Sequence, residues 1–117
     1  MKTDLFRQSE DIEAFKAGAI IFSEGQEAGG VMYIVQDGQV DILVHGECID
    51  TIGPGTCLGE IALIDQWPRS ATAVAKTDCK LVPINERRFQ YLVQQTPHFA
   101  LQVMRTMAER LRKYRDY

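Results

Sequence analysis

The side chains that could recognise a ligand gather in the segment 55–73, which reads GTCLGEIALIDQWPRSATA. Gly59 is expected to open a short turn of helix after a strand, and a helix start offers unpaired N–H groups and a positive dipole end to a phosphate. Arg69 follows Glu60 by nine residues, and its guanidinium can hold two phosphate oxygens at once. The segment therefore predicts a phosphate site, to which Ser70 adds a hydroxyl donor.

Glu60 is unexpected in a phosphate site, because its carboxylate repels an anion. Its presence is explained if its partner is a ribose hydroxyl, which donates a hydrogen bond to a carboxylate. Arg69 would then offset the charge of Glu60. Together the two side chains predict a ligand with a single phosphate charge and a free 2′-hydroxyl. The alternative is a structural salt bridge between them beneath an empty pocket.

The same segment resembles the phosphate-binding cassette of the cyclic nucleotide-binding domain. This family includes the bacterial catabolite activator protein, the regulatory subunits of cyclic-nucleotide-dependent kinases and cyclic-nucleotide-gated channels. The resemblance rests on GEIAL at 59–63 and PRSA at 68–71, and upstream on FSEG at 22–25, MYIV at 32–35 and DGQV at 37–40. The motifs stand in the family's order and the resemblance extends over residues 12–112.

The resemblance implies an eight-stranded jelly-roll β-barrel, a short phosphate-binding helix and C-terminal helices that cover the base or dimerise. It implies that Glu60 takes the ribose 2′-hydroxyl and Arg69 the cyclic phosphate, with nearby backbone groups completing the cradle. The ligand-binding residues expected on this basis are Gly59, Glu60, Ile61, Ala62, Leu63, Arg69, Ser70 and Ala71. The expected ligand is cAMP, with cGMP as the alternative, because cGMP sites of the family often carry threonine where this chain has Ser70.

The elements that must position these residues fall into two halves. All nine glycines lie at or before Gly59, and the regular turn signals predict short strands. These strands are expected over 19–23, 31–36, 40–45, 47–52, 71–76 and 79–85. Asp37-Gly38 predicts a type I′ hairpin. We expect a mainly β barrel over about 12–85, followed by helices over 86–95, capped by Asn85, and 97–115, capped by Thr96, in one domain spanning 1–117.

The second helix carries an apolar stripe and a basic cluster. The stripe, at spacings of four and three, consists of Ala100, Met104, Met107, Leu111 and Tyr114. It fits either packing against the chain's own barrel or a homodimer through the C-terminal helix, since two heptads do not decide for a coiled coil. The basic cluster consists of Arg105, Arg110, Arg112, Lys113 and Arg115. We interpret it as a solvated helix face.

Composition excludes several classes of protein. The chain has 117 residues, of which 45% are hydrophobic and 25% charged, as in an ordinary globular domain. Its net charge of −3 argues against attraction to nucleic acid or an anionic membrane, and it has no membrane-span or signal-peptide stretch. The three cysteines form no CxxC pair, so we expect reduced, buried thiols in a cytoplasmic protein. The two distant histidines favour neither a metal site nor an enzyme.

The function expected from the sequence is a sensor that signals cyclic nucleotide occupancy through its C-terminal helices to an unidentified effector protein. The alternative is a degenerate domain that serves as a dimerisation or docking module. The chain stops at Tyr117 without a helix-turn-helix, so no DNA binding is expected of it.

Overall fold

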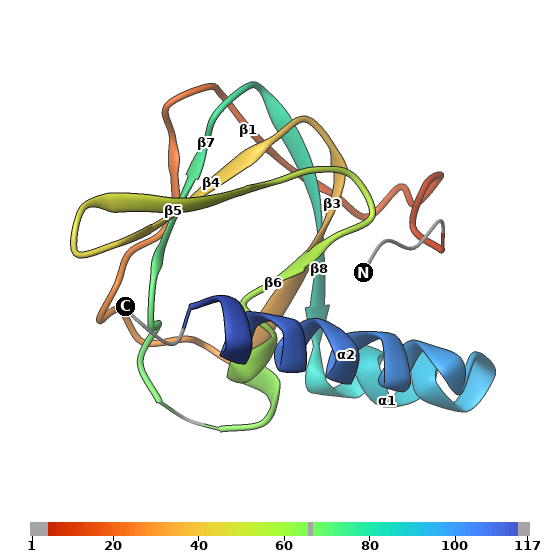
Figure 1. Cartoon of the computed structure of the whole chain (residues 1–117). Coiled ribbons are helices and arrows are strands. Elements are labelled where there is room, and N and C mark those ends of the chain that lie inside the picture. The colour runs from red at the N-terminus through yellow and green to blue at the C-terminus, as the bar shows by residue number, and fades with distance from the viewer. Residues whose placement is uncertain (1–4, 66, 115–117) are drawn as a thin grey trace.

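The computed structural model describes residues 5–65 and 67–114. Along these residues, strands fill the first two thirds and α-helices the last third (Figure 1). The strands are β1 (Glu13–Phe15), β2 (Ile20–Phe22), β3 (Val31–Asp37), β4 (Val40–Val44), β5 (Glu47–Ile52), β6 (Cys57–Leu58), β7 (Thr72–Ala75) and β8 (Cys79–Asn85). The helices are the 3-10 helix η1 (Glu60–Leu63), α1 (Glu86–Gln95) and α2 (His98–Lys113).

The eight strands form two antiparallel sheets of four. One has the order β1-β8-β3-β6 and the other the order β2-β7-β4-β5. The mainly β fold with eight strands and C-terminal helices is thus confirmed. The closed jelly-roll barrel is not, because among the described residues no hydrogen-bond ladder passes from one sheet to the other.

The predicted hairpin at Asp37-Gly38 is wrong. β3 and β4, which it joins, lie in different sheets, and only Gly38 has a positive φ. Gly38 is needed there because a Cβ would collide with the carbonyl oxygen of Asp78 at the start of β8. The turn with two positive φ angles is instead His45-Gly46, which joins β4 to β5 as a true hairpin.

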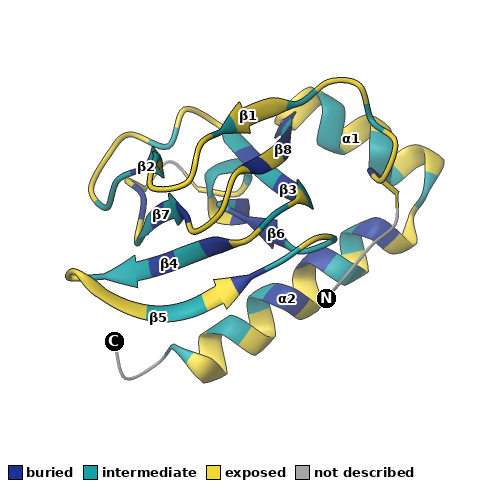
Figure 2. Cartoon of the chain, turned by 90° about the horizontal axis from the view of Figure 1, so that it is seen from above, coloured by how far each residue is buried: buried dark blue, intermediate teal, exposed yellow. Residues whose placement is uncertain are grey.

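Two apolar clusters hold the fold together. One fills the space between the sheets, where Val40 and Ile42 of β4 face inward as their alternation with polar residues predicts. The other lies where the helices cover the β1-β8-β3-β6 sheet, and Phe99 and Val103 of α2 are buried in it (Figure 2). Its strand side chains are Met32, Ile34, Cys57, Val82 and Ile84. α2 is therefore fixed to the sheet through its N-terminal half.

The helix boundaries follow the sequence closely. The side chain of Asn85 accepts a hydrogen bond from the Arg88 amide at 2.8 Å, so the predicted cap of α1 is confirmed. α2 begins at His98 with Pro97 at the cap position and without a side-chain cap bond, so the predicted cap at Thr96 is wrong; the Thr96 carbonyl accepts from the Phe99 amide at 2.9 Å. The predicted end of this helix beyond Tyr114, with Arg115 of the basic cluster, lies outside the described residues.

The predicted apolar stripe of α2 does not form one face in the structure. Met107 and Tyr114 are half-buried, whereas Met104 is 56% and Leu111 75% exposed. The buried side instead runs through Phe99, Val103 and Thr106, one position earlier. The prediction of three buried cysteines is also wrong for Cys48, which is exposed; Cys57 and Cys79 are buried.

Candidate ligand-binding site

A cavity of about 370 Å³ lies between η1, the segment after it, the β4–β5 hairpin and the C-terminal half of α2. Seven of the eight predicted site residues line it: Gly59, Glu60, Ile61, Ala62, Arg69, Ser70 and Ala71. Leu63 lies elsewhere, because its side chain packs against the apolar cluster beneath the helices. The fold thus brings together η1 and the residues around Arg69. Their spacing in the sequence could only suggest that they lie close to each other.

Gly59 sets the geometry at the start of η1. Its φ of 72° lies in the left-handed region, which favours glycine. A Cβ at this position would also collide with Nη1 of Arg69, so the guanidinium can lie against the turn only because the side chain is absent. The Ala62 amide donates to the Gly59 carbonyl at 3.1 Å. One of the backbone donors expected in the cradle is therefore already used within η1.

Arg69 lies 8% exposed beneath the cavity and holds two loops together. Its Nη2 donates to the carbonyls of Ala28 at 3.0 Å and Val31 at 2.8 Å, and its Nη1 to the carbonyl of Gly59 at 3.3 Å. The guanidinium carbon also lies 4.1 Å from the centre of the Phe22 ring. Among the described residues, the buried Nε of Arg69 has no hydrogen-bond partner. Burial lowers the pKa of Arg69, which marks the cost of holding this charge away from water.

Glu60 is paired with an arginine that the sequence did not assign to the site. The carboxylate is 5% exposed, and Nη1 of Arg110 on α2 donates to both of its oxygens at 2.8 Å. Nη2 of Arg110 donates to the Cys57 carbonyl. Burial alone would lower the pKa of Arg110, but the charge and hydrogen bonds of Glu60, together with the neighbouring Cys57 and Tyr114, outweigh it and raise the pKa. Among the described residues, the salt bridge between Glu60 and Arg69 that was the alternative to a ligand site is therefore not formed, and Arg110 is not part of the solvated face expected for the basic cluster.

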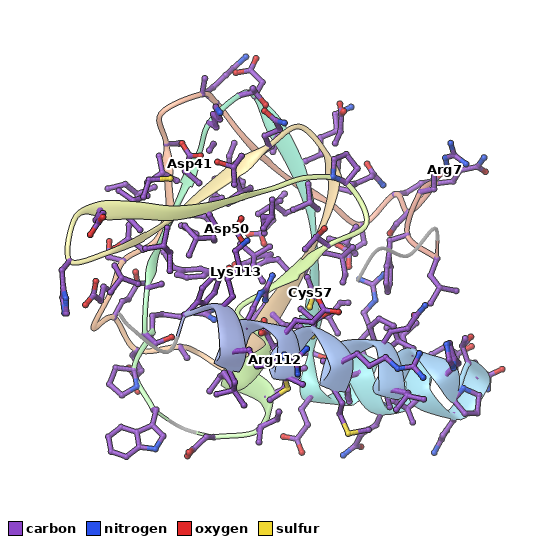
Figure 3. All side chains as sticks on the ribbon, viewed as in Figure 1. Arg7, Asp41, Asp50, Cys57, Arg112 and Lys113 are labelled. Carbon is purple, nitrogen blue, oxygen red and sulfur yellow. The ribbon has the colours of Figure 1, made fainter. Side chains whose placement is uncertain are left out.

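A second polar contact holds the end of α2 to β5. The Tyr114 hydroxyl donates to one oxygen of Asp50 at 2.5 Å, and Nζ of Lys113 lies 3.1 Å from the other. Figure 3 shows Asp50 and Lys113 at this end of the helix. Burial alone would raise the pKa of Asp50, but the bonds from Tyr114 and Lys113 lower it overall. Burial and the bond to Asp50 raise the pKa of Tyr114, so its ring lines the cavity as a neutral group.

Charged and apolar side chains both line the cavity. Glu60, Arg69 and Arg110 carry one negative and two positive charges. The apolar side chains come from β4, β5 and β6 and from α2. They are Ile42, Val44, Ile49, Leu58, Met107 and Leu111. The arrangement suits a flat apolar group attached to a singly charged anion.

Neither a metal site nor a membrane helix is found in the described parts of the chain. No group of three or more His, Cys, Asp or Glu side chains there could hold a metal ion. None of the helices described is long and apolar enough to cross a bilayer. Burial, with the charge of Glu60 beside it, raises the pKa of the Cys57 thiol to about 12. Cys57 is therefore a packing residue under the site and not a nucleophile.

Comparisons with known proteins show which proteins the chain resembles in sequence and fold. A cAMP-dependent protein kinase regulatory subunit from Eremothecium gossypii is 41% identical over 76 residues, which are 65% of this chain and only 16% of that protein. The catabolite activator protein of Thermus thermophilus superposes with a TM-score of 0.79 at 29% identity, over 95% of this chain and 54% of that one. A structure reported for a cyclic-GMP-dependent signalling pathway in bacterial phytopathogenesis gives a TM-score of 0.76 at 29% identity, over 92% and 90% of the two chains.

The family model of the cyclic nucleotide-binding domain matches residues 12–96. This match contains all eight strands, η1 and α1, and therefore Glu60 and Arg69 of the cavity lining but not Arg110. The chain belongs to the cyclic nucleotide-binding domain family.

Proposed function

We propose that the chain binds a cyclic nucleotide, cAMP in preference to cGMP, in the cavity beneath α2 and signals occupancy to a partner protein through its C-terminal helices. One observation carries the proposal. Nε of Arg69 is a buried donor without a partner among the described residues, on a side chain that lines the same cavity as Glu60. A phosphate oxygen would give this donor a charge-assisted hydrogen bond, worth about 1.5–3 kcal/mol net.

The charges that line the cavity support a monoanionic ligand. Glu60 and Arg110 neutralise each other, which leaves the charge of Arg69 at the cavity wall without an ion pair among the described residues. A cyclic phosphate diester carries one negative charge and would balance it. The carboxylate of Glu60 has further lone pairs beside those that Arg110 uses, and these can accept the ribose 2′-hydroxyl.

The apolar side chains that line the cavity support adenine over guanine. A base placed there lies between Ile42 and Ile49 on the sheet side and Leu111 on the helix side. Guanine brings both a carbonyl and an amino group to its edge, and burying a polar group without a partner costs free energy. Adenine brings the amino group alone. Ser70, where cGMP sites of the family often carry threonine, favours the same ligand.

Signalling through α2 follows from Arg110. In the proposed complex the ribose and α2 share one carboxylate, so occupancy changes the contacts that hold the C-terminal half of the helix. The ligand can shift the helix only if it binds one arrangement better than the other. A partner protein that senses the position of α2 would then receive the signal.

The alternative function, a domain that binds no nucleotide and serves only for dimerisation or docking, has one observation in its favour. Both oxygens of Glu60 are already bonded to Arg110, and Arg69 already holds three carbonyls. These bonds show that both residues also have a structural role. Arg69→Ala, which the sequence alone suggests would leave the fold intact, is for this reason expected to destabilise it.

Calorimetry and thermal unfolding with cAMP, cGMP and 2′-deoxy-cAMP test the proposal. At a hundredfold excess over its dissociation constant, a ligand stabilises the fold by about 2.7 kcal/mol. We expect cAMP to bind more tightly than cGMP, and both more tightly than the deoxy analogue.

Arg69→Gln should abolish binding. The matched control is Arg88→Gln, because Arg88 is a partly buried arginine that bonds to Pro83 and Asp11 away from the cavity. The absence of a shift with any nucleotide would contradict the proposal and favour the docking module.

A further inference from the structure

The outer face of α2 carries an apolar stripe that no part of the described chain covers. Leu101, Met104 and Leu111 are 41%, 56% and 75% exposed, and Ala108 between them is exposed as well. Their spacings of three, four and three are those of the a and d positions of a heptad repeat. On the helix this stripe lies beside the row of Phe99, Val103 and Thr106, the buried side of α2, and Figure 2 shows that α2 has both buried and exposed sides.

One edge of the stripe is basic. Arg105 and Arg112 each follow an exposed stripe residue by one position, so both lie on the same side of it, two helical turns and about 10 Å apart. Both are exposed, and no ion pair of either is formed among the described residues. Glu109 lies further round the helix, but it follows Arg105 by four residues and precedes Arg112 by three, so it neighbours both arginines and leaves this edge with a net charge of one positive unit. The other edge runs through Ala100 and Met107 into the packed face of α2 and carries no charge.

We infer that this stripe, defined by Leu101, Met104, Ala108 and Leu111, is the docking surface for an acidic amphipathic helix of a partner protein. Such a helix places its own apolar residues at heptad spacing against the stripe. Acidic residues two turns apart on its flank meet Arg105 and Arg112. The chain as a whole carries a net charge of −3, so the attraction comes from this local arginine edge.

A second copy of α2 is a poorer occupant. In an antiparallel pair the basic edges of the two helices face each other, and like charges repel. In a parallel pair Arg105 and Arg112 face the uncharged edge with Ala100 and Met107, and gain no acidic partner. The charge pattern therefore selects a partner of opposite sign, which is how flanking positions of paired helices set partner choice.

The docking surface also touches the ligand cavity. Leu111 belongs to the stripe and lines the cavity, and the preceding residue, Arg110, holds Glu60. Docking itself does not depend on the proposed function. Its coupling to nucleotide does, and if both hold, nucleotide and partner change each other's affinity by the same factor.

Two synthetic peptides of about 21 residues test the docking surface on the full chain without nucleotide. Both carry Leu at a and d; one carries Glu and the other Lys at e and g, and each repels its own copies. Fluorescence anisotropy should show that the Glu peptide binds about tenfold more tightly, and that Arg105→Glu/Arg112→Glu reverses the order. The matched control Lys76→Glu/Lys80→Glu makes the same charge change on β8 and the turn before it, and should leave the order unchanged.

Met104→Asp should weaken both peptides, with folding checked by circular dichroism. Equal affinity of the two peptides for the unaltered chain, or a reversal in the lysine control, overturns the inference. So does sedimentation that shows a micromolar dimer broken by Met104→Asp, because a second copy then covers the stripe. Since no nucleotide is present, these results stand whether or not the calorimetry finds cAMP binding, so the two failures are distinguishable.

Discussion

The two halves of α2 are attached to the same domain by different forces. In the N-terminal half, Phe99 and Val103 are 0% and 3% exposed within an apolar cluster. In the C-terminal half, Arg110 bonds to Glu60, while Lys113 and Tyr114 bond to Asp50. The first half is fixed by shape and the second by polar groups that water or a ligand can replace.

This difference teaches where a signal can begin. Apolar packing is lost only when the cluster opens, which costs a large part of the stability of a small domain. A polar contact can be exchanged for one with a ligand hydroxyl at little net cost, because each side keeps a partner. The cavity lies under the exchangeable half alone, so a ligand there would act on the end of α2 and leave its base in place.

Phe99→Ala tests the N-terminal half of α2, which apolar packing fixes, and we expect the largest loss of stability there. Its ring is fully buried and contacts the rings of Phe6 and Phe89, with centroid distances of 5.7 and 5.6 Å. Removing such a ring typically costs about 3–5 kcal/mol, because transfer and cavity terms add. Urea unfolding measures this loss. The matched control is Tyr91→Ala, an aromatic residue of α1 that is 60% exposed and should cost far less. Equal losses would mean that the helices are not anchored by this cluster.

Arg110→Met tests the C-terminal half of α2, which polar contacts hold, and we expect an intermediate loss of stability. It leaves Glu60 without its counter-ion, and breaking a fully buried pair costs about 3–5 kcal/mol. We expect about 2 kcal/mol, because the end of α2 can open locally and let water reach the carboxylate. Hydrogen exchange should show faster amide exchange in the C-terminal half of α2 and unchanged exchange around Phe99.

The double variant Glu60→Gln/Arg110→Met is the control for this prediction, because it removes both charges together. It should regain much of the stability lost in Arg110→Met, since no unpaired charge remains. If the double variant is instead less stable than Arg110→Met by the full cost of a second independent substitution, the ion pair does not hold the helix.

The strands and the cassette were predictable from the sequence because their signals are local. The alternation through Val40 and Ile42 marks the inward face of β4, and Gly59 marks the turn that opens η1. β1 and β6 were missed, since three and two residues are too few to show a period of two. Asp37-Gly38 was wrongly predicted to form a hairpin, because glycine is required there by the close approach of the Asp78 backbone and not by a hairpin turn.

Arg110 was missed because its partner is distant and its helix face is not apolar throughout. The buried side of α2 continues from Phe99 and Val103 through Thr106 to Arg110, and a hydropathy pattern stops at the threonine. The neighbouring stripe with Met104 and Leu111 is more hydrophobic but faces outward. A helical spacing of four and three from Phe99 could have placed Arg110 on the inner side. Nothing in the sequence says that Glu60, fifty residues earlier, faces it.

The smallest effect on stability is expected at Asp50, where a change of pH can remove the charge of the side chain without changing its shape. Its pKa is lowered in the fold, so its charge stabilises the fold above the unfolded value of about 3.9, and this contribution is lost as the pH falls through the lower folded value. Asp50→Asn keeps an acceptor for Tyr114 but removes the charge beside Lys113. Urea midpoints of the two proteins should therefore differ near pH ~7 and converge as the pH falls through the lowered folded pKa of Asp50. If the difference between the two urea midpoints instead stays constant with pH, the carboxylate of Asp50 holds the end of α2 by hydrogen bonding alone, and its charge contributes nothing to this contact.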